Sequence, residues 1–436
     1  MAQSITHVST HLLGGSAVMR AVCFLELLFP HPRSFAIRLW DGTLLSATSS
    51  EPQFILVFNT PGAVRSTFTP PVELNAAEAF IRDDFDIQGD IFSSFALLRQ
   101  ISASAHSAQQ MTKLAQHWFN LPAADTNNPI ISRGPAQLTK AKHSKARDEV
   151  AIQYHYDVGN DFYALFLDRR MVYSCAHFPT GAEDLDTAQE RKLDQICRKL
   201  RLKPGERVLD IGCGWGGLLH HIIDHYPNSQ VNGLTLSTQQ FEYVNQDRNQ
   251  SLSVDLRSWQ DYSASEHKFD SIISIGAFEH FASFNDQAGS KQRDIYQTFF
   301  EWCQSISTAE AQIGLQTIVI SRAPNSVSEL RDSRYLLNKV FPGSALPTIS
   351  DIQAAIIDKY EISAVSRIGL DYARTLNEWK QRLVLNKEMI IERYGQNLFN
   401  HYIIYFEAAQ RCFESGYVDL YQASLKRVKP IRILTK

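Results

Sequence analysis

The chain has 436 residues, of which 44% are hydrophobic and 20% are charged, and its formal net charge is -3 at pH 7. This composition is typical of a globular protein and excludes a disordered one, and the length predicts two domains. The small net charge provides no global attraction to nucleic acid. The six cysteines are scattered without paired spacing, so neither a metal site nor a disulfide framework is indicated, and we expect a cytoplasmic protein.

The first 125 residues are predicted to form a small mixed α+β domain. Residues 12–30 are apolar but are interrupted by Arg20 and Glu26, so the segment is too short and too charged to span a membrane. The helical spacing of its apolar residues predicts an amphipathic helix docked on the domain, with a membrane-surface helix as the alternative. The other elements expected here are a hairpin or small sheet over residues 35–40 and 54–58, and helices over residues 61–68 and 74–82.

Residues 126–147 are polar and lose the apolar periodicity, which predicts a linker. From residue 148 to residue 436 strand and helix patterns alternate, and this order predicts an α/β domain with a doubly wound parallel sheet. The predicted strands cover residues 207–210, 230–234, 271–275 and 314–320, and the predicted helices from residue 350 onward include residues 377–393 and 400–414.

A glycine-rich turn is the most informative segment of the chain. The sequence Val208-Leu-Asp-Ile-Gly-Cys-Gly-Trp-Gly-Gly217 leads directly into an apolar-periodic segment. This order predicts a buried strand, a tight turn against a bound cofactor, and a helix. Nicotinamide, flavin and S-adenosylmethionine enzymes all use such a turn. The next strand ends in Thr235-Leu-Ser237 where a nicotinamide enzyme usually carries an acidic residue, and Asp210 fits a methyltransferase, so the pattern favours S-adenosylmethionine.

These residues and their neighbours resemble the cyclopropane-fatty-acyl-phospholipid synthase family, which includes the mycolic acid cyclopropane synthases. The matching segments occur in family order, and the N-terminal region also resembles that of the longer phospholipid-modifying members. The segments that carry the resemblance are residues 35–42, 85–90, 155–163, 171–176, 208–217, 233–237, 274–280, 341–343 and 371–376.

The resemblance implies a Rossmann-like class I methyltransferase domain that binds S-adenosylmethionine outside the carboxyl ends of its strands. The glycines would face the amino-acid part of the cofactor, the end of the second strand would face the ribose, and an aromatic residue with a polar neighbour would face the adenine. The implied cofactor-binding residues are Tyr173, Ser174, Asp210, Gly212, Gly214, Gly216, Thr235, Leu236, Gln240, Trp259 and Gln260.

The resemblance also implies methylene transfer to an acyl-chain double bond, with ring closure by loss of a proton to a bound bicarbonate. The family's bicarbonate cradle corresponds to Cys175, Glu279, Ile318 and Tyr372. The chain has Gln316 where the family has a histidine, and a neutral glutamine cannot carry charge or move a proton near neutral pH. Three outcomes stay open: weaker bicarbonate binding, Glu279 as the base, or collapse of the cation to a methylene or methyl-branched product.

The implied substrate is an unsaturated phospholipid or fatty-acyl chain, which the enzyme would meet by peripheral contact with a membrane, as a monomer or a homodimer. Two other functions stay open. Plant alkaloid N-methyltransferases share much of this catalytic domain, so a small-molecule C- or N-methyltransferase is one, although the lipid-synthase-like N-terminal region argues against it. A non-catalytic lipid-binding or partner-binding protein is the other, and it would be expected to lose Asp210, the glycines or Glu279.

Overall fold

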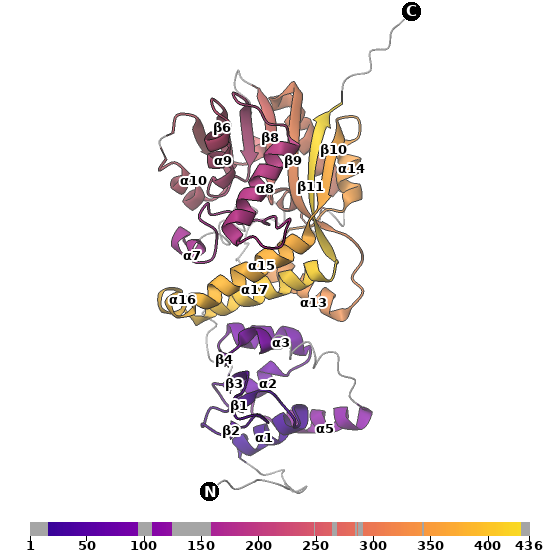
Figure 1. The fold of residues 1–436 in the computed structure, drawn as a ribbon. Coiled ribbons are helices and arrows are strands. Elements are labelled where there is room, and N and C mark those ends of the chain that lie inside the picture. The colour runs from indigo at the N-terminus through magenta and orange to yellow at the C-terminus, as the bar shows by residue number, and fades with distance from the viewer. Residues whose placement is uncertain are drawn as a thin grey trace, which may run out of the picture. The chain divides into compact units, whose positions relative to one another are not determined.

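The structure is a computed structural model and describes residues 16–94, 107–123, 158–247, 249–263, 268–283, 286, 291–341 and 344–428. The chain divides into two compact units, one of residues 1–134 with 391–401 and one of residues 135–390 with 402–436 (Figure 1). The expected linker, residues 12–15 of the expected first helix, and residues 155–157 and 342–343 of the matching segments lie outside the described residues. The domain boundaries near residues 125 and 147 therefore stay a prediction.

The N-terminal unit contains a small sheet in the strand order β2-β1-β3-β4. Strand β1 pairs antiparallel with β2 and parallel with β3, so the expected hairpin or small sheet is a small mixed sheet. The strands are β1 (Ala36–Arg38), β2 (Leu44–Leu45), β3 (Phe54–Phe58) and β4 (Phe85–Gly89), and the helices are α1 (Ala17–Leu28), α2 (Ala63–Thr67), α3 (Val72–Ile81) and α5 (Ala108–Phe119).

Helix α1 is docked on the N-terminal unit, as the sequence predicts. It begins after Ser16, whose side chain accepts a hydrogen bond from Met19 N, and it buries Ala21, Phe24 and Leu25. The ring of Phe24 lies 5.6 Å from that of Phe68, centroid to centroid, within an aromatic core. In the described part of the chain, no helix is both long enough and apolar enough to cross a membrane.

The second unit is built on a seven-stranded sheet in the order β10-β11-β9-β8-β5-β6-β7. Neighbouring strands from β9 to β7 are parallel, which confirms the α/β fold class. The expectation of a wholly parallel sheet is wrong at one edge, because β11 runs antiparallel to both β9 and β10. The strands are β5 (Arg207–Ile211), β6 (Gln230–Thr235), β7 (Leu252–Leu256), β8 (Phe269–Ile275), β9 (Ser307–Ile320), β10 (Tyr360–Arg367) and β11 (Val418–Arg427).

Helices cover both faces of this sheet (Figure 1). One core cluster packs α12 and α14 against the sheet, and the other packs α8 and α9 against its opposite face. The helices are α7 (Asn160–Ala164), α8 (Leu185–Lys199), α9 (Gly217–His225), α10 (Thr238–Val244), α12 (Gln292–Ile306), α13 (Val327–Tyr335), α14 (Ile349–Ile356), α15 (Gly369–Leu385), α16 (Lys387–Tyr394) and α17 (Gln396–Glu414), with the short turns η1 (Trp259–Asp261), η2 (Phe278–His280) and η3 (Leu336–Val340).

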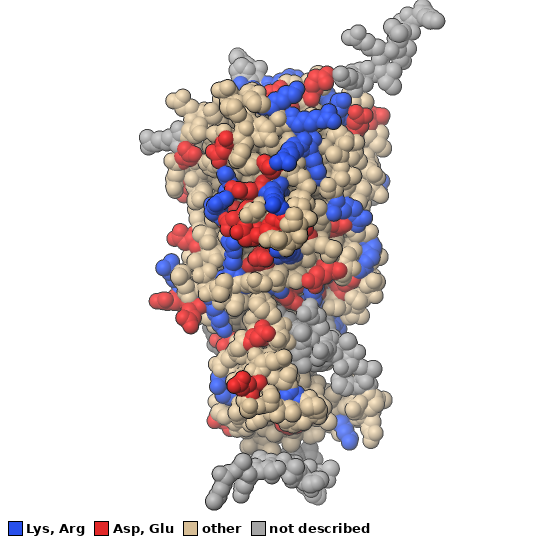
Figure 2. Space-filling model, in the orientation of Figure 1, with Lys and Arg blue, Asp and Glu red and all other residues tan. Residues whose placement is uncertain are grey.

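Helices α8 and α9 each begin at a residue suited to cap a helix. Asp184 caps the start of α8 by accepting a hydrogen bond from Thr187 N, and Arg198 and Lys199 occupy its last turn, where cations interact favourably with the helix dipole. Gly216 caps α9 at a φ of +78°, a conformation that a side chain disfavours. On the visible face of this unit, acidic and basic side chains are interspersed, in keeping with the small net charge (Figure 2).

Candidate active site

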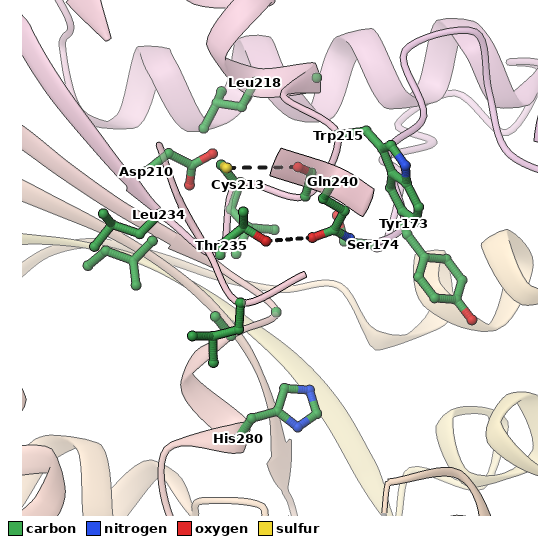
Figure 3. A pocket seen from close by; sticks show the side chains of 18 of the residues that line it. Tyr173, Ser174, Asp210, Cys213, Trp215, Leu218, Leu234, Thr235, Gln240 and His280 are labelled. Atoms are coloured by element: carbon green, nitrogen blue, oxygen red, sulfur yellow. Dashed lines mark hydrogen bonds between the residues drawn. The ribbon is translucent and has the colours of Figure 1, made fainter. Parts of the chain in front are cut away.

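A cavity of about 210 Å³ opens at the carboxyl ends of β5, β6 and β8, which is the position where doubly wound sheets bind their ligands. Ten of the eleven predicted cofactor-binding residues line it (Figure 3). They are Tyr173, Ser174, Asp210, Gly212, Gly214, Thr235, Leu236, Gln240, Trp259 and Gln260. The eleventh, Gly216, does not line the cavity, and a side chain there would meet Val244 at 3.1 Å.

The glycine-rich turn leaves room for a ligand at one position. The backbone N–H groups of Gly212 and Cys213 both donate to Leu234 O, at 2.9 and 3.0 Å, so the turn is tied to the end of β6. Gly214 has a φ of +55°, and a Cβ added to it would meet no atom within 4 Å. The added group would instead project into open space beside the cavity that Gly214 lines.

The end of β6 presents a fixed polar pair. Thr235 Oγ1 donates to Gln240 Oε1 at 2.8 Å, and Ser237 caps α10 by accepting from Gln240 N (Figure 3). Thr235 and Gln240 are both buried, so their remaining hydrogen-bonding groups are held ready for a ligand in the cavity. Across the cavity, Trp259 is buried against Phe299 with ring centroids 5.3 Å apart and still contributes to the lining.

Asp210 places a buried carboxyl group in the cavity wall. Its side chain is 3% exposed, and its Oδ1 atom has no hydrogen-bond partner among the described residues. Burial raises the pKa of Asp210 to about 7, and the buried cation of Lys192 acts in the opposite direction. An orphaned carboxylate oxygen beside an open glycine turn fits a ligand with an ammonium group, as in the amino-acid part of S-adenosylmethionine.

Glu279 lies immediately behind the cavity wall. A Cβ added to the lining residue Gly276 would lie 3.9 Å from Glu279 Oε1. Thr317 Oγ1 donates to Glu279 Oε2 at 2.7 Å, and a backbone hydrogen bond from Ile318 also favours the ionised carboxylate. Burial outweighs these contacts and raises the pKa of Glu279 to about 7. Glu279 and Ile318, two members of the predicted cradle, are thus brought together, with Thr317 as an unpredicted partner.

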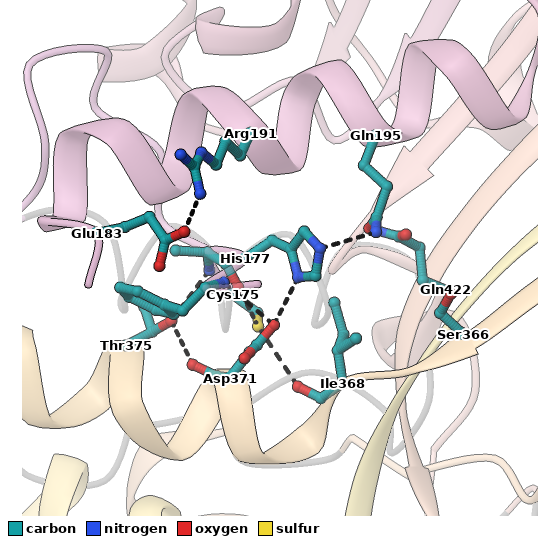
Figure 4. A network of polar contacts seen from close by, with 12 residues as sticks. Cys175, His177, Glu183, Arg191, Gln195, Ser366, Ile368, Asp371, Thr375 and Gln422 are labelled. Carbon is teal, nitrogen blue, oxygen red and sulfur yellow. Dashed lines mark hydrogen bonds and ion pairs between the residues drawn. The ribbon is translucent and has the colours of Figure 1, made fainter. Parts of the chain in front are cut away.

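Cys175 and Tyr372 both contact Ile368, and Ile368 is hydrogen-bonded to the strand that pairs with β9 at Ile318. Ile318 pairs with Leu420 on β11, and Leu420 O accepts a hydrogen bond from Ile368 N at 3.0 Å. Ile368 O in turn accepts from Tyr372 N at 3.3 Å and lies 3.9 Å from Cys175 Sγ (Figure 4). Burial raises the pKa of the Cys175 thiol well above its usual value, so the thiol stays neutral. The backbone of Cys175 is therefore the group that would hydrogen-bond an anion.

A hydrogen-bond network holds the Cys175 segment against the start of α15 (Figure 4). His177 Nδ1 lies 2.7 Å from Asp371 Oδ2, in the residue next to Tyr372. Ala176 N donates to Thr375 Oγ1 at 3.0 Å, and that hydroxyl donates to Asp371 O at 2.7 Å. The network holds together the two segments that carry Cys175 and Tyr372, the predicted cradle residues that lie outside the sheet.

The Gln316 side chain contacts strand β11. Adjacent residues in a strand alternate between faces, so Gln316 and Thr317 point to opposite sides of β9, and the Glu279 carboxylate bonds to Thr317. Gln316 Oε1 accepts from Gln422 Nε2 at 3.0 Å, and Gln422 Oε1 accepts from Lys199 Nζ. The buried Gln316 side chain therefore ends a chain that starts at a lysine on α8, and it does not line the large cavity.

The sequence did not assign a role to several residues near the cavity. Lys192 and His280 line it. Lys192 stands four residues after Ala188 and four before Ile196 on the apolar face of α8, so its helical position was the signal for a buried lysine. Phe278 is fully buried and its ring stacks on that of Tyr296 with centroids 4.2 Å apart, while Phe281 lines the cavity.

Comparison with known proteins gives a consistent result. The family model for mycolic acid cyclopropane synthetase matches residues 143–423. Cyclopropane mycolic acid synthase 2 of Mycobacterium leprae is 35% identical over 292 residues, covering 63% of this chain and 92% of that protein. The cyclopropane-fatty-acyl-phospholipid synthase of Escherichia coli is 33% identical over 284 residues, covering 65% of this chain and 69% of that protein.

One relative spans both units. A probable fatty acid methyltransferase of Pseudomonas putida is 28% identical over 403 residues, which are 90% of this chain and 91% of that protein. Among solved structures, mycolic acid cyclopropane synthase CmaA1 complexed with SAH and CTAB superposes with a TM-score of 0.58 at 32% identity, covering 64% of this chain and 98% of that one.

Proposed function

The chain belongs to the mycolic acid cyclopropane synthetase family and is an S-adenosylmethionine-dependent methyltransferase, and on this premise we propose that it transfers a methylene group to the double bond of unsaturated phospholipid acyl chains. The product is a cyclopropane fatty-acyl chain. The observation that carries this proposal is the buried carboxyl of Glu279 directly behind the wall of the cofactor cavity.

The residues of the cavity suit the cofactor. S-adenosylmethionine supplies an electrophilic sulfonium methyl group when it is bound. Asp210 offers an orphaned carboxylate oxygen to an ammonium group, Gly214 leaves open space for the amino-acid part, and Thr235 with Gln240 offers hydrogen bonds to a ribose. Trp259 offers an apolar ring surface to the adenine.

Glu279 is suited to stabilise positive charge on the acyl chain. With a pKa near 7 the buried carboxyl is available in both protonation states at neutral pH. Its ionised form, held by Thr317 and Ile318, provides a preorganised negative charge where water is excluded. The same carboxyl can accept the proton that is lost on ring closure, and backbone groups of Cys175 and Ile318, with Tyr372, would hold bicarbonate if it serves as the base instead.

The N-terminal unit supports the lipid assignment. The Pseudomonas putida relative named as a fatty acid methyltransferase matches over both units, and the Escherichia coli relative is named for an acyl-phospholipid substrate. We propose residues 1–125 as a lipid-binding domain and residues 148–436 as the catalytic domain, acting on phospholipid by peripheral contact with a membrane. A homodimer is part of the same proposal and is checked by the mass of the protein in solution.

Mass spectrometry of phospholipids from cells expressing the chain tests the proposal. The expected result is a gain of one CH2 per modified acyl chain, with an acid-labile ring. The variant Glu279→Gln is expected to lower this product about 100-fold or more while it keeps S-adenosylmethionine affinity, and Glu301→Gln, at an exposed glutamate, is the matched control. A CH2 gain without a ring identifies a methylene or methyl-branched product, and unmodified lipids overturn the lipid assignment.

A further inference from the structure

Lys192 is a fully buried lysine in the cofactor cavity. It lies in the middle of α8, has 0% of its surface exposed, and contributes to the cavity lining. Its Nζ atom donates to Ser174 Oγ at 2.9 Å. Among the residues that the structure describes this neutral hydroxyl is its hydrogen-bond partner, and the ammonium carries further donors.

Among the described residues, no ion pair joins the ammonium of Lys192 to a carboxylate. Burial lowers the pKa of Lys192 to about 8, and the carboxylates of Asp168 and Asp210 act against this from a distance. The two oxygens of Asp168 accept from Val172 N and Arg170 N, and among the described residues no ion pair joins Asp168 to Lys192. A buried ammonium without an adjacent anion is costly, so its presence calls for an anionic group that is not part of the described chain.

Asp210 lines the same cavity and is a buried acidic group that, within the described part of the chain, has no hydrogen-bond partner at one oxygen. Its Oδ1 atom is buried without a hydrogen-bond partner, and no ion pair joins it to Lys192 among the described residues. A cavity that holds one unsatisfied buried anion and one incompletely satisfied buried cation matches a zwitterion. The α-amino acid end of a ligand has this character, with an ammonium group for Asp210 and a carboxylate for the opposite side.

We propose that Lys192, together with the Ser174 hydroxyl, binds the α-carboxylate of S-adenosylmethionine. The inference rests on the proposed use of this cofactor and adds a residue that selects for its carboxylate. Charge-assisted hydrogen bonds in a buried site are among the strongest polar contacts, so Lys192 accounts for much of the preference for an amino-acid ligand. Lys192 also fixes Ser174, and Gln189 one turn earlier donates to Ser174 O at 2.8 Å.

A purely structural lysine is the competing explanation, because α8 holds the segment that carries Tyr173 and Ser174. Two ligands separate the explanations. Decarboxylated S-adenosylmethionine lacks only the carboxylate, so a residue that binds this group affects one ligand and leaves the other unchanged. A residue that merely shapes the cavity affects both ligands to the same extent.

The experiment is calorimetric titration of the full chain with both ligands. Wild type is expected to bind S-adenosylmethionine about 10- to 100-fold more tightly than the decarboxylated compound. Lys192→Met should lose about tenfold or more of this preference, entirely through weaker binding of S-adenosylmethionine. Arg198→Met is the matched control, since Arg198 is an exposed cation on the same helix outside the cavity, and it should keep the wild-type preference.

A second variant keeps the test decisive if Lys192→Met does not fold. Ser174→Ala retains the lysine and removes the hydroxyl, and it should weaken binding of S-adenosylmethionine selectively. Equal losses for both ligands, or an unchanged preference in the variants, overturn the role of Lys192 while leaving cofactor use intact. Absence of S-adenosylmethionine binding to the wild-type chain overturns the proposed function itself.

Discussion

Removal of the Glu279 carboxyl should change how the stability of the protein depends on pH. Burial raises the pKa of Glu279 from the ordinary 4.5 to about 7 in the folded chain. Between these values the folded state keeps a proton that the unfolded state releases, so the free energy of unfolding falls as pH rises. Above pH 7 both states are ionised and the penalty stays constant. The difference between the two pKa values corresponds to about 3 kcal/mol.

Glu279→Gln keeps a carbonyl oxygen for the hydrogen bond from Thr317 Oγ1 and removes the titration. The free energy of unfolding of this variant, relative to wild type, should therefore rise by about 3 kcal/mol from about pH 4.5 to about pH 8. Urea denaturation of both ligand-free proteins across this range measures the difference, and other buried groups such as Asp210 cancel because both proteins contain them. A difference that does not change with pH would refute the assignment of a raised pKa to Glu279.

Three further predictions concern the turn, the cradle and the helical cover. Gly214→Ala places a methyl group in the open space beside the cavity and should weaken S-adenosylmethionine binding about tenfold or more by calorimetry. Gln316→His restores a group able to carry charge, and should raise the rate or the cyclopropane fraction and increase the response to added bicarbonate, measured by gas chromatography. Glu407→Gln removes the carboxylate that lies 2.6 Å from the buried ammonium of Lys380 and should lower the free energy of unfolding by about 3 kcal/mol.

Each of these three predictions has a contrary result, and the first and the third have a matched control. Gly205→Ala has a similar left-handed φ of +82° and open space but lies outside the cavity, so equal losses of affinity in both alanine variants would reject the role of Gly214. Identical products, rates and bicarbonate dependence in wild type and Gln316→His would show that residue 316 does not influence the reaction. Arg198→Met removes an exposed ion pair and should cost about 1 kcal/mol or less, and a cost as small for Glu407→Gln would contradict the reasoning.

The strands next to the cofactor cavity could be predicted from the sequence, because their signals are local. Strand β5 was expected over residues 207–210 and ends at Ile211, and β6 was expected over residues 230–234 and ends at Thr235. Each strand is a short apolar run that stops at a turn, and the turn residues fix where the cofactor-binding groups begin. Ten cavity residues followed from these positions and from the family resemblance.

The antiparallel edge of the sheet could not be predicted in the same way. Strand β10 has the burial of an edge strand, alternating half-buried and exposed, and its alternating positions include Glu361, Ser363 and Arg367. Strand β11 follows a long helix and pairs with β9 and β10, which are both far away in the sequence. The orientation of Gln316 depends on this pairing, because Gln422 belongs to β11. Contacts between distant segments leave no periodic pattern in either one.

The hydrogen bonds from Lys199 through Gln422 to Gln316 fix the orientation of two side-chain amides, which two amides alone would leave undetermined. A protonated ammonium only donates, so Gln422 must turn its oxygen to Lys199 and its nitrogen to Gln316. Gln316 then accepts through its oxygen, and its NH2 group is the end that faces onward. Burial lowers the pKa of Lys199 to about 8, so above this pH a neutral amine can accept as well as donate, and the reversed orientation of both amides becomes possible. Protonation of one lysine of α8 thereby fixes the orientation of the Gln316 amide on β9 below this pH.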